Sequence, residues 1–230
     1  RPLFGPHGLA FAEGKVWFTA EGSKAVGCFD PQTQRVDWCM GTGQDRTHLI
    51  YVSPDANNIY TTNTVSGTVS ILSKTKSGNS ENWAQTIIPA SAGTEGFDVS
   101  PDGTELWAVA RDNGKIYIIN TGSKKIEYTI DADIVGADRL KFTPDGKRVL
   151  VSTLSSGTLS VYDAKTQKEI TKINIGHGAA RIMIAPDGSR AYVSCSPDNY
   201  VAVVDLRTLE VIGHIDVGKN PDGLAWAVLK

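Results

Sequence analysis

The chain has 230 residues, of which 40% are hydrophobic and 21% are charged, and its net charge is −2. These proportions are near the globular norm and exclude a disordered chain, and the scattered Lys and Arg residues form no basic stripe for nucleic acid. The longest apolar run, AWAVL at 225–229, is far too short to span a bilayer. The composition therefore predicts a globular fold with no nucleic-acid partner and no membrane span.

The three cysteines, Cys28, Cys39 and Cys195, do not have the close pair spacing of a zinc site or of a thioredoxin-like redox motif. Cys28 and Cys39 flank the turn DPQTQ, which leaves a disulfide open, but burial as small apolar side chains is the favoured interpretation. The chain begins at Arg1 without a visible signal peptide, which indicates either a removed leader or a fragment.

A Pro-Asp turn recurs along the chain at intervals of 47, 43 and 42 residues. Pro presets φ, Asp hydrogen-bonds its own backbone and Gly accepts a positive φ, so these residues are expected to be structural. The four copies are SPDA (53–56), SPDG (100–103), TPDG (143–146) and APDG (185–188).

Each turn lies within a set of four short alternating or β-branched runs. In the repeat around residue 143 these runs are RLKFT (139–143), RVLVSTL (148–154), GTLSVYD (157–163) and ITKINIG (170–176). No window shows apolar residues at helical spacing. Four hairpin-linked strands in a repeat of about 42 residues are the signature of a β-propeller blade.

We therefore predict an all-β fold, a β-propeller of four-stranded antiparallel blades, with 1–230 as a single domain. The expected blades are 5–44, 45–93, 94–136, 137–178 and 179–219, followed by a closing strand at 220–230.

The two ends of the chain are near copies of each other, GPHGLAF (5–11) and NPDGLAW (220–226). The second copy is expected to be the first strand of a further blade, whose other strands this sequence does not supply. With the repeat as ruler, about 70–100 residues are expected before Arg1 in the parent protein. If the 230 residues are the whole molecule, its open blade edges predict self-association through Asp222–Val228.

The repeats resemble those of the YVTN-repeat β-propellers, which are related to surface-layer-like proteins. The tetrapeptide appears loosely as YTTN (60–63) and YVSC (192–195), and the segment PDGSRAYVSCSPDNYVAVVDLRTLEVIGHIDVG follows the surrounding pattern. The resemblance covers nearly the whole chain. It implies a seven-bladed parent that is an exported prokaryotic protein with an extracytoplasmic location (secreted, periplasmic or at the cell surface).

One segment also resembles a blade of the streptogramin-lyase-type propellers, VWFTAEGSKAVGCFDPQT (16–33). The catalytic His and Glu of that family match no position in this sequence, so neither is carried over.

Aligning the repeats on their turns gives one equivalent position near the start of each first strand. In a propeller these strands line the central channel, and their starts gather at one mouth. Five of the six side chains can ionise or bind a metal ion, far more than an average composition provides. These six first-strand positions are His7, His48, Glu95, Asp138, Ala180 and Asp222.

Two interpretations of these positions stay open. The polar groups can satisfy backbone amides and hold channel waters, or they can bind a divalent metal through His7, His48, Glu95 and Asp138. His177 can reach over the same mouth, and Arg181 can pair with Asp138 or Asp222, so both join the candidate ligand-binding residues.

The favoured function is a non-enzymatic binding or scaffold module whose ligand is a protein, a glycan or a small molecule. The alternative is a metal-assisted lyase or hydrolase that uses the polar first-strand positions. No catalytic motif decides whether the protein is an enzyme. Trp83, in the longest insertion KTKSGNSENWAQ (74–85), is expected to be an exposed aromatic contact for a partner.

Overall fold

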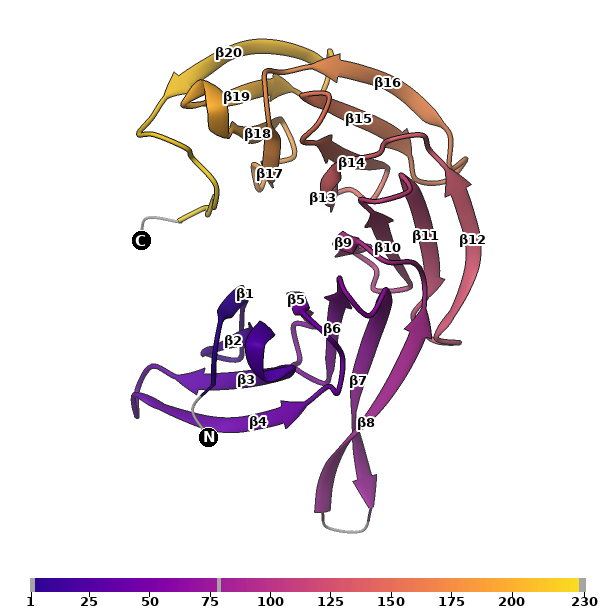
Figure 1. Ribbon diagram of the computed structural model, residues 1–230, viewed down its shortest axis with the longest axis vertical. Coiled ribbons are helices and arrows are strands. Elements are labelled where there is room, and N and C mark those ends of the chain that lie inside the picture. The colour runs from indigo at the N-terminus through magenta and orange to yellow at the C-terminus, as the bar shows by residue number, and fades with distance from the viewer. Residues whose placement is uncertain (1–2, 78–79, 228–230) are drawn as a thin grey trace. The chain divides into compact units, whose positions relative to one another are not determined.

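The computed structural model describes residues 3–77 and 80–227 and contains five four-stranded sheets (Figure 1). In each sheet the four strands are consecutive in the chain, and each strand pairs with the next. A meander of four strands, repeated five times, is the β-propeller architecture. The predicted fold class is confirmed. No helix among the described residues is long and apolar enough to cross a membrane.

The strands are short, mostly of six or seven residues. The first sheet holds β1 (Pro6–Ala12), β2 (Lys15–Ala20), β3 (Ala25–Asp30) and β4 (Arg35–Gly41). The second holds β5 (Thr47–Val52), β6 (Asn58–Asn63), β7 (Thr68–Ser77) and β8 (Ser80–Pro89). The third holds β9 (Thr94–Val99), β10 (Glu105–Ala110), β11 (Lys115–Asn120) and β12 (Lys125–Asp131). The fourth holds β13 (Ala137–Phe142), β14 (Arg148–Thr153), β15 (Thr158–Asp163) and β16 (Glu169–Asn174). The fifth holds β17 (Ala179–Ile184), β18 (Arg190–Cys195), β19 (Tyr200–Asp205) and β20 (Glu210–Asp216).

The chain divides into two compact units, and the third sheet contributes to both. Unit 1 comprises Arg1–Glu95 and Ile119–Glu127, and unit 2 comprises Gly96–Ile118 and Tyr128–Lys230. The single domain over 1–230 stays a prediction.

The Pro-Asp turns connect the first and second strands as their chemistry predicts. In the second copy, the Asp102 carboxylate accepts hydrogen bonds from the Ser100 hydroxyl (2.6 Å) and the Thr104 amide (3.0 Å). Gly103 has φ +75°, and Ala56, which replaces this glycine in the first copy, has φ +49°. The carboxylate thus closes the turn, and glycine relieves the backbone where φ is positive.

Apolar side chains of neighbouring sheets form the core of each unit. In unit 1, Trp17 of the first sheet packs with Ile59 and Leu72 of the second. In unit 2, Val161 of the fourth sheet packs with Ala191 and Val204 of the fifth. Burial of these strand faces is the main source of stability, because each sheet alone would expose an apolar surface.

The longest insertion extends a hairpin instead of forming a loop. β7 and β8 each have ten residues and stay paired out to Ser77 and Ser80 (Figure 1). Trp83 lies on β8, and its ring is 5.1 Å from that of Trp38 and 6.3 Å from that of Trp17. The prediction of an exposed aromatic contact was therefore wrong, because this ring packs against two others and is only partly exposed. Residues 78–79 of the insertion lie outside the described residues.

The first strands of the first, second, fourth and fifth sheets carry a β-bulge near their start. The register shifts between Pro6 and Leu9, between Thr47 and Ile50, between Ala137 and Arg139, and between Ala179 and Ile182. A bulge leaves backbone groups unpaired by the ladder and redirects the side chains at that point. The bulges contain the first-strand positions.

A buried hydroxyl on the second strand supplies the hydrogen bonds that these bulges lack. The Thr19 hydroxyl on β2 accepts from the Gly8 amide (2.8 Å) and donates to the His48 carbonyl of the next sheet (2.6 Å). Ser194 on β18 repeats the pattern, accepting from the Arg181 amide and donating to the Asp222 carbonyl, both at 3.0 Å. One side chain therefore links a bulge in its own sheet to the first strand of the following repeat.

The same link recurs in the second and fourth sheets, and a different residue makes it in the third. The Thr62 hydroxyl donates to the Glu95 carbonyl (2.7 Å), and the Ser152 hydroxyl donates to the Ala180 carbonyl. The third sheet has Val109 at the equivalent position, and Val109 has no hydroxyl. There the Asp138 carbonyl accepts a hydrogen bond from Arg139 Nη1 instead (2.8 Å).

The segment after β20 is not a strand within the described residues. The Asp222 carbonyl accepts from Ser194, the Pro221 carbonyl accepts from Ser196, and the Trp226 ring lies 6.1 Å from that of Tyr192. The closing strand at 220–230 stays a prediction: residues 220–227 are not in a strand here, and 228–230 lie outside the described residues. A strand needs ladder hydrogen bonds, and this segment contacts the fifth sheet through side chains.

All three cysteines are free. Cys28 pairs with Trp38 across the β3–β4 hairpin, and Cys39 pairs with Gly27, so the two thiols are not directly opposite each other. Cys28 and Cys195 are buried, as expected. Cys39 is exposed, so the expectation of burial was wrong for this residue.

Removing a linking hydroxyl should destabilise the fold. Thr19→Val keeps the side-chain shape but leaves the buried Gly8 amide and the His48 carbonyl without this partner. We expect the free energy of unfolding, measured with urea, to fall by about 1–3 kcal/mol. Thr33→Val, in the exposed turn after β3, is the control and should change it by less than about 0.5 kcal/mol. Equal effects of the two substitutions would contradict the linking role.

The cysteines should differ sharply in reactivity. Burial raises the pKa of Cys195 to about 11 and also raises the pKa of Cys28. At pH 8 the thiolate fraction of Cys195 is then about one thousandth. We expect alkylation followed by mass spectrometry to label Cys39 alone in the native protein and all three in urea. Labelling of native Cys195 as fast as Cys39 would be inconsistent with its burial.

Candidate functional site

Four polar side chains gather in unit 1 at the starts of its first strands. His7 lies on β1, His48 on β5 and Glu95 on β9, and Glu21 directly follows β2. The bulges at His7 and His48 and the hydroxyls of Thr19 and Thr62 fix the backbone from which these side chains extend. We call these four residues the imidazole–carboxylate cluster.

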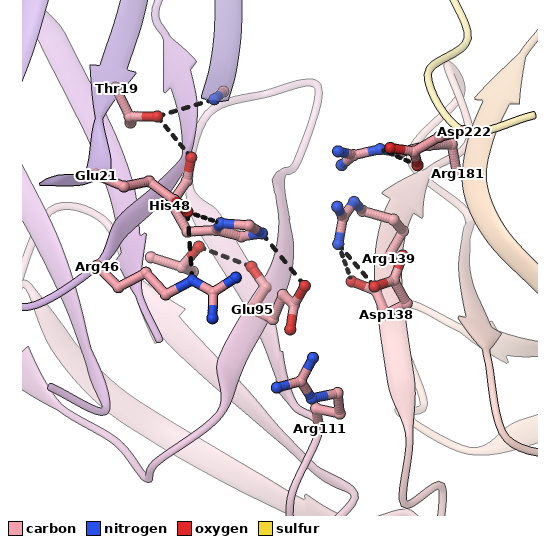
Figure 2. A network of polar contacts seen from close by, with 12 residues as sticks. Thr19, Glu21, Arg46, His48, Glu95, Arg111, Asp138, Arg139, Arg181 and Asp222 are labelled. Atoms are coloured by element: carbon pink, nitrogen blue, oxygen red, sulfur yellow. Dashed lines mark hydrogen bonds and ion pairs between the residues drawn. The ribbon is translucent and has the colours of Figure 1, made fainter. Parts of the chain in front are cut away.

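His48 is the centre of this cluster. It is 3% exposed, and Figure 2 shows its ring between the carboxylates of Glu21 and Glu95. Nδ1 contacts Glu21 Oε1, and Nε2 lies 3.2 Å from Glu95 Oε1. The imidazole of His7 stacks on that of His48, with ring centroids 3.9 Å apart and an interplanar angle of 27°. Two imidazoles and two carboxylates thus share one largely buried space.

A glycine permits the approach of β1 to β5. A Cβ added to Gly8 would lie 2.7 Å from the His48 carbonyl oxygen and 3.0 Å from the Ile50 amide nitrogen. Real Cβ atoms do not approach backbone atoms so closely, so any larger residue would push the two strands apart. Gly8 is therefore required for His7 to stack on His48.

Charge within the cluster acts on Glu21. Partial burial alone would raise the pKa of Glu21, but the hydrogen bond and charge of His48 outweigh it, with His7 and Arg46 acting in the same direction. The net effect holds the pKa of Glu21 below its ordinary value. Glu21 is therefore a carboxylate at neutral pH. Arg46 Nε lies 3.5 Å from Glu21 Oε1 on the exposed side.

Three members of the cluster can act as metal ligands. One donor atom each from His7, Glu21 and His48 lies within 4.8 Å of the other two. Among the described residues, no other group of three or more His, Cys, Asp or Glu side chains brings its donor atoms this close together. Two imidazoles and one carboxylate form a donor set that borderline transition metals favour.

The predicted metal ligands are thus brought together in part. His7, His48 and Glu95 lie in the cluster, whereas Asp138 belongs to unit 2 and its carboxylate lies 3.0 Å from Arg139 Nη1. Asp138 as a metal ligand stays a prediction.

In unit 2 the first-strand positions are associated with arginines. Arg139 follows Asp138 on β13, and Arg181 follows Ala180 on β17. Arg181 Nε lies 3.3 Å from Asp222 Oδ1, so the expected salt bridge forms with Asp222. Burial lowers the pKa of Arg181, and the positive charge of Arg139 lowers it further.

His177 lies in unit 2, before β17, and its side chain is 86% exposed. Its Nδ1 is 3.0 Å from Asp198 Oδ1, and its amide donates to Asp198 Oδ2 (2.6 Å). The hydrogen bond from this amide is the main cause that holds the pKa of Asp198 below its ordinary value. Within unit 2 His177 is therefore an exposed imidazole fixed by a carboxylate. Its reach over a common mouth stays a prediction.

The alignment on Pro-Asp turns missed Glu21 and Arg139. Glu21 stands two residues after Thr19, the residue whose hydroxyl links two repeats. The equivalent residues of the next two repeats are Thr64 and Arg111, so the side chains at this position share no chemical type. Arg139 is one residue past the aligned position. The repeat pattern therefore gives no signal for Glu21.

Solved structures with similar folds include enzymes. Hydrazine synthase of Kuenenia stuttgartiensis is 19% identical with a TM-score of 0.76, over 90% of this chain and 65% of that chain. A streptogramin B lyase is 19% identical with a TM-score of 0.79, over 94% of this chain and 70% of that one. Virginiamycin B lyase from Staphylococcus aureus is 14% identical with a TM-score of 0.80, over 96% and 74%. At these identities the likeness shows the fold alone. The chain thus spans less than two thirds of the hydrazine synthase chain.

No curated protein matches the sequence. The comparisons do not show the YVTN-repeat family, so that resemblance remains an expectation. The family model described as "Cytochrome D1 heme domain" matches residues 12–188, which is well over half of the chain. This chain belongs to the cytochrome D1 heme domain family.

Proposed function

We propose that this protein is a ligand-binding propeller that holds a divalent transition-metal ion through His7, Glu21 and His48. The observation that carries the proposal is the convergence of these three donors within 4.8 Å. Zn²⁺, Co²⁺, Ni²⁺ and Fe²⁺ accept imidazole nitrogen together with carboxylate oxygen. With three protein donors, such an ion keeps a coordination position for an external ligand.

The charge of the cluster supports a cation. Glu21 is a carboxylate at neutral pH, and a second carboxylate, Glu95, lies beside Nε2 of the buried His48. Two acidic groups in a poorly solvated space are costly unless positive charge compensates them. Arg46 supplies part of that charge at Glu21, and a divalent ion would add to it.

The distances require only a small contraction. Two donors bound to one ion at about 2.1 Å lie at most about 4.2 Å apart. On a tetrahedral ion the donors would lie about 3.4 Å apart, so atoms within 4.8 Å of one another reach that spacing with movements of less than about 1 Å per side chain. An imidazole nitrogen binds an ion only when it carries no proton, so protons compete with the ion for this site.

The description of the family suggests haem as a cofactor. The geometry of His7 and His48 shows whether these two histidines could hold a haem iron between them. Haem iron takes its two axial ligands from opposite faces of a macrocycle. The rings of His7 and His48 stack at 3.9 Å, which is van der Waals contact and leaves no space for a macrocycle between them. The pair does not fit the two axial positions of one haem, and no part of the proposed function uses a haem.

The favoured role of the metal-loaded protein is binding of a small molecule, a glycan or a protein. An extracytoplasmic location is part of this proposal, because the resemblance of the repeats to exported propellers implies it.

The second candidate function is metal-assisted lyase or hydrolase chemistry. It is favoured by the position of Glu95, whose carboxylate lies 3.2 Å from His48 Nε2 and would act as a base beside a metal-bound water. Turnover of cyclic esters by the metal-loaded protein, lost in Glu95→Gln while the metal is retained, would establish catalysis over binding alone.

Metal binding is tested by elemental analysis. After incubation with Zn²⁺ and gel filtration at pH 7.5, we expect one ion per chain, removable by a chelator. His48→Ala and Glu21→Gln should each weaken binding by at least about tenfold, because each removes one of three donors. Affinity should fall between pH 7.5 and pH 6, because protons compete for the imidazoles.

The control variant is His214→Ala, which removes an exposed imidazole on β20. It should bind Zn²⁺ like the unmodified protein. Circular dichroism shows whether His48→Ala folds, and Glu21→Gln provides an independent test if it does not. Absence of a bound ion in the unmodified protein, or full occupancy in both variants, would refute the metal site.

A further inference from the structure

Arg46 occupies a backbone position at which the other repeats have glycine or asparagine. It lies two residues before the first-strand position His48 and has φ +55°. The residue two before each of the other first-strand positions also has a positive φ, and Arg46 is the one large side chain in the series. These six residues are Gly5 (+65°), Arg46 (+55°), Gly93 (+76°), Gly136 (+88°), Gly178 (+62°) and Asn220 (+52°).

The fold imposes this left-handed conformation on Arg46. Its carbonyl accepts a hydrogen bond from the Thr64 amide (3.1 Å), just as the carbonyl of Gly5 accepts one from the Glu21 amide (2.9 Å) in the first repeat. A residue with a Cβ atom is disfavoured in this conformation, whereas glycine adopts it freely. The second repeat therefore carries a backbone cost that glycine would avoid. Such strain is typical of positions whose side chain has a function.

The side chain of Arg46 contacts the imidazole–carboxylate cluster. Its Nε lies 3.5 Å from Glu21 Oε1, the same oxygen that His48 Nδ1 contacts (Figure 2). The side chain of Arg46 is 51% exposed, and that of Glu21 is 21% exposed. The guanidinium group therefore approaches this carboxylate from the solvent side and opposes its negative charge.

A metal ion on Glu21 and the guanidinium group of Arg46 would oppose each other. An ion about 2.1 Å from Oε1 would lie within about 6 Å of Arg46 Nε. Two positive charges at this distance repel, and the exposure of Arg46 screens only part of that repulsion. His48 still contacts the Glu21 oxygen, so the carboxylate does not depend on Arg46 alone for its orientation.

We propose that Arg46 is a competitor built into the chain, which lowers the affinity of the imidazole–carboxylate cluster for its metal ion. The inference rests on the proposed metal site. When an ion binds, it takes the Glu21 oxygen, and the half-exposed side chain of Arg46 turns toward solvent. A residue that is not a ligand thus sets the affinity, and the ion can be released as well as bound.

The test is a titration of the full chain with Zn²⁺ at pH 7.5, in competition with a chromophoric chelator. Arg46→Gln should raise the affinity for Zn²⁺ by about threefold to tenfold, because it removes the opposing charge. Arg46→Lys keeps the charge and should stay within about twofold of the unmodified protein. Arg35→Gln removes an exposed arginine of β4 and is the matched control, also expected within about twofold.

Two further measurements separate this role from a structural one. The visible spectrum of bound Co²⁺ should be alike in Arg46→Gln and the unmodified protein, because the three donors are unchanged. Arg46→Gly should raise the affinity for Zn²⁺ as Arg46→Gln does. It should also have a higher midpoint of urea unfolding than Arg46→Gln, because glycine adopts the positive φ without strain.

Unchanged or weaker Zn²⁺ binding in Arg46→Gln, with binding by the unmodified protein, would overturn this role and leave the metal site standing. An equal rise in Arg35→Gln would also overturn it, because it would indicate a general effect of net charge. Absence of Zn²⁺ binding in both the unmodified protein and Arg46→Gln would refute the metal site and this inference with it. Binding by Arg46→Gln alone would support the inference in its strongest form.

Discussion

The structure depends on a hydroxyl group that is buried on the second strand of four of the five sheets. Thr19 and Ser194 each accept a hydrogen bond from a bulged amide in their own sheet and donate one to a carbonyl of the next repeat. Without such a partner a bulge would bury unsatisfied backbone groups, which costs about as much as a lost hydrogen bond. The hydroxyl allows the bulge, and the bulge directs the following polar side chain out of the sheet.

The same constraint explains why the first-strand positions can be chemically varied. Their backbone carbonyls carry the structural hydrogen bonds, so the side chains of His48, Glu95, Ala180 and Asp222 are not required to hold the strands. Unit 1 uses this freedom for imidazoles and carboxylates, and unit 2 for arginines and aspartates. The backbone carbonyl of each of these residues links two repeats, so the chemistry of its side chain can differ from one repeat to the next.

The repeat could be predicted because turn chemistry and strand periodicity are local. Pro-Asp-Gly and the alternating runs predicted all five sheets, and the alignment predicted that His7, His48 and Glu95 would gather. Glu21 could not be predicted, because its contact with His48 joins residues 27 positions apart in different repeats. The packing of Trp83 was missed for the same reason, since it depends on Trp17 and Trp38 of another sheet.

Val109 shows how a missing hydroxyl changes the role of a neighbouring side chain. Because Val109 has no hydroxyl, Arg139 takes over the hydrogen bond to the Asp138 carbonyl, and Arg139 also lies 3.0 Å from the Asp138 carboxylate. Arg181 has no such duty, because Ser194 holds its backbone and its side chain pairs only with an exposed carboxylate among the contacts described. A substitution at Arg181 therefore costs little stability, whereas one at Arg139 exposes an unsatisfied carbonyl. The fold therefore constrains the side chain of Arg139 more strongly than that of Arg181.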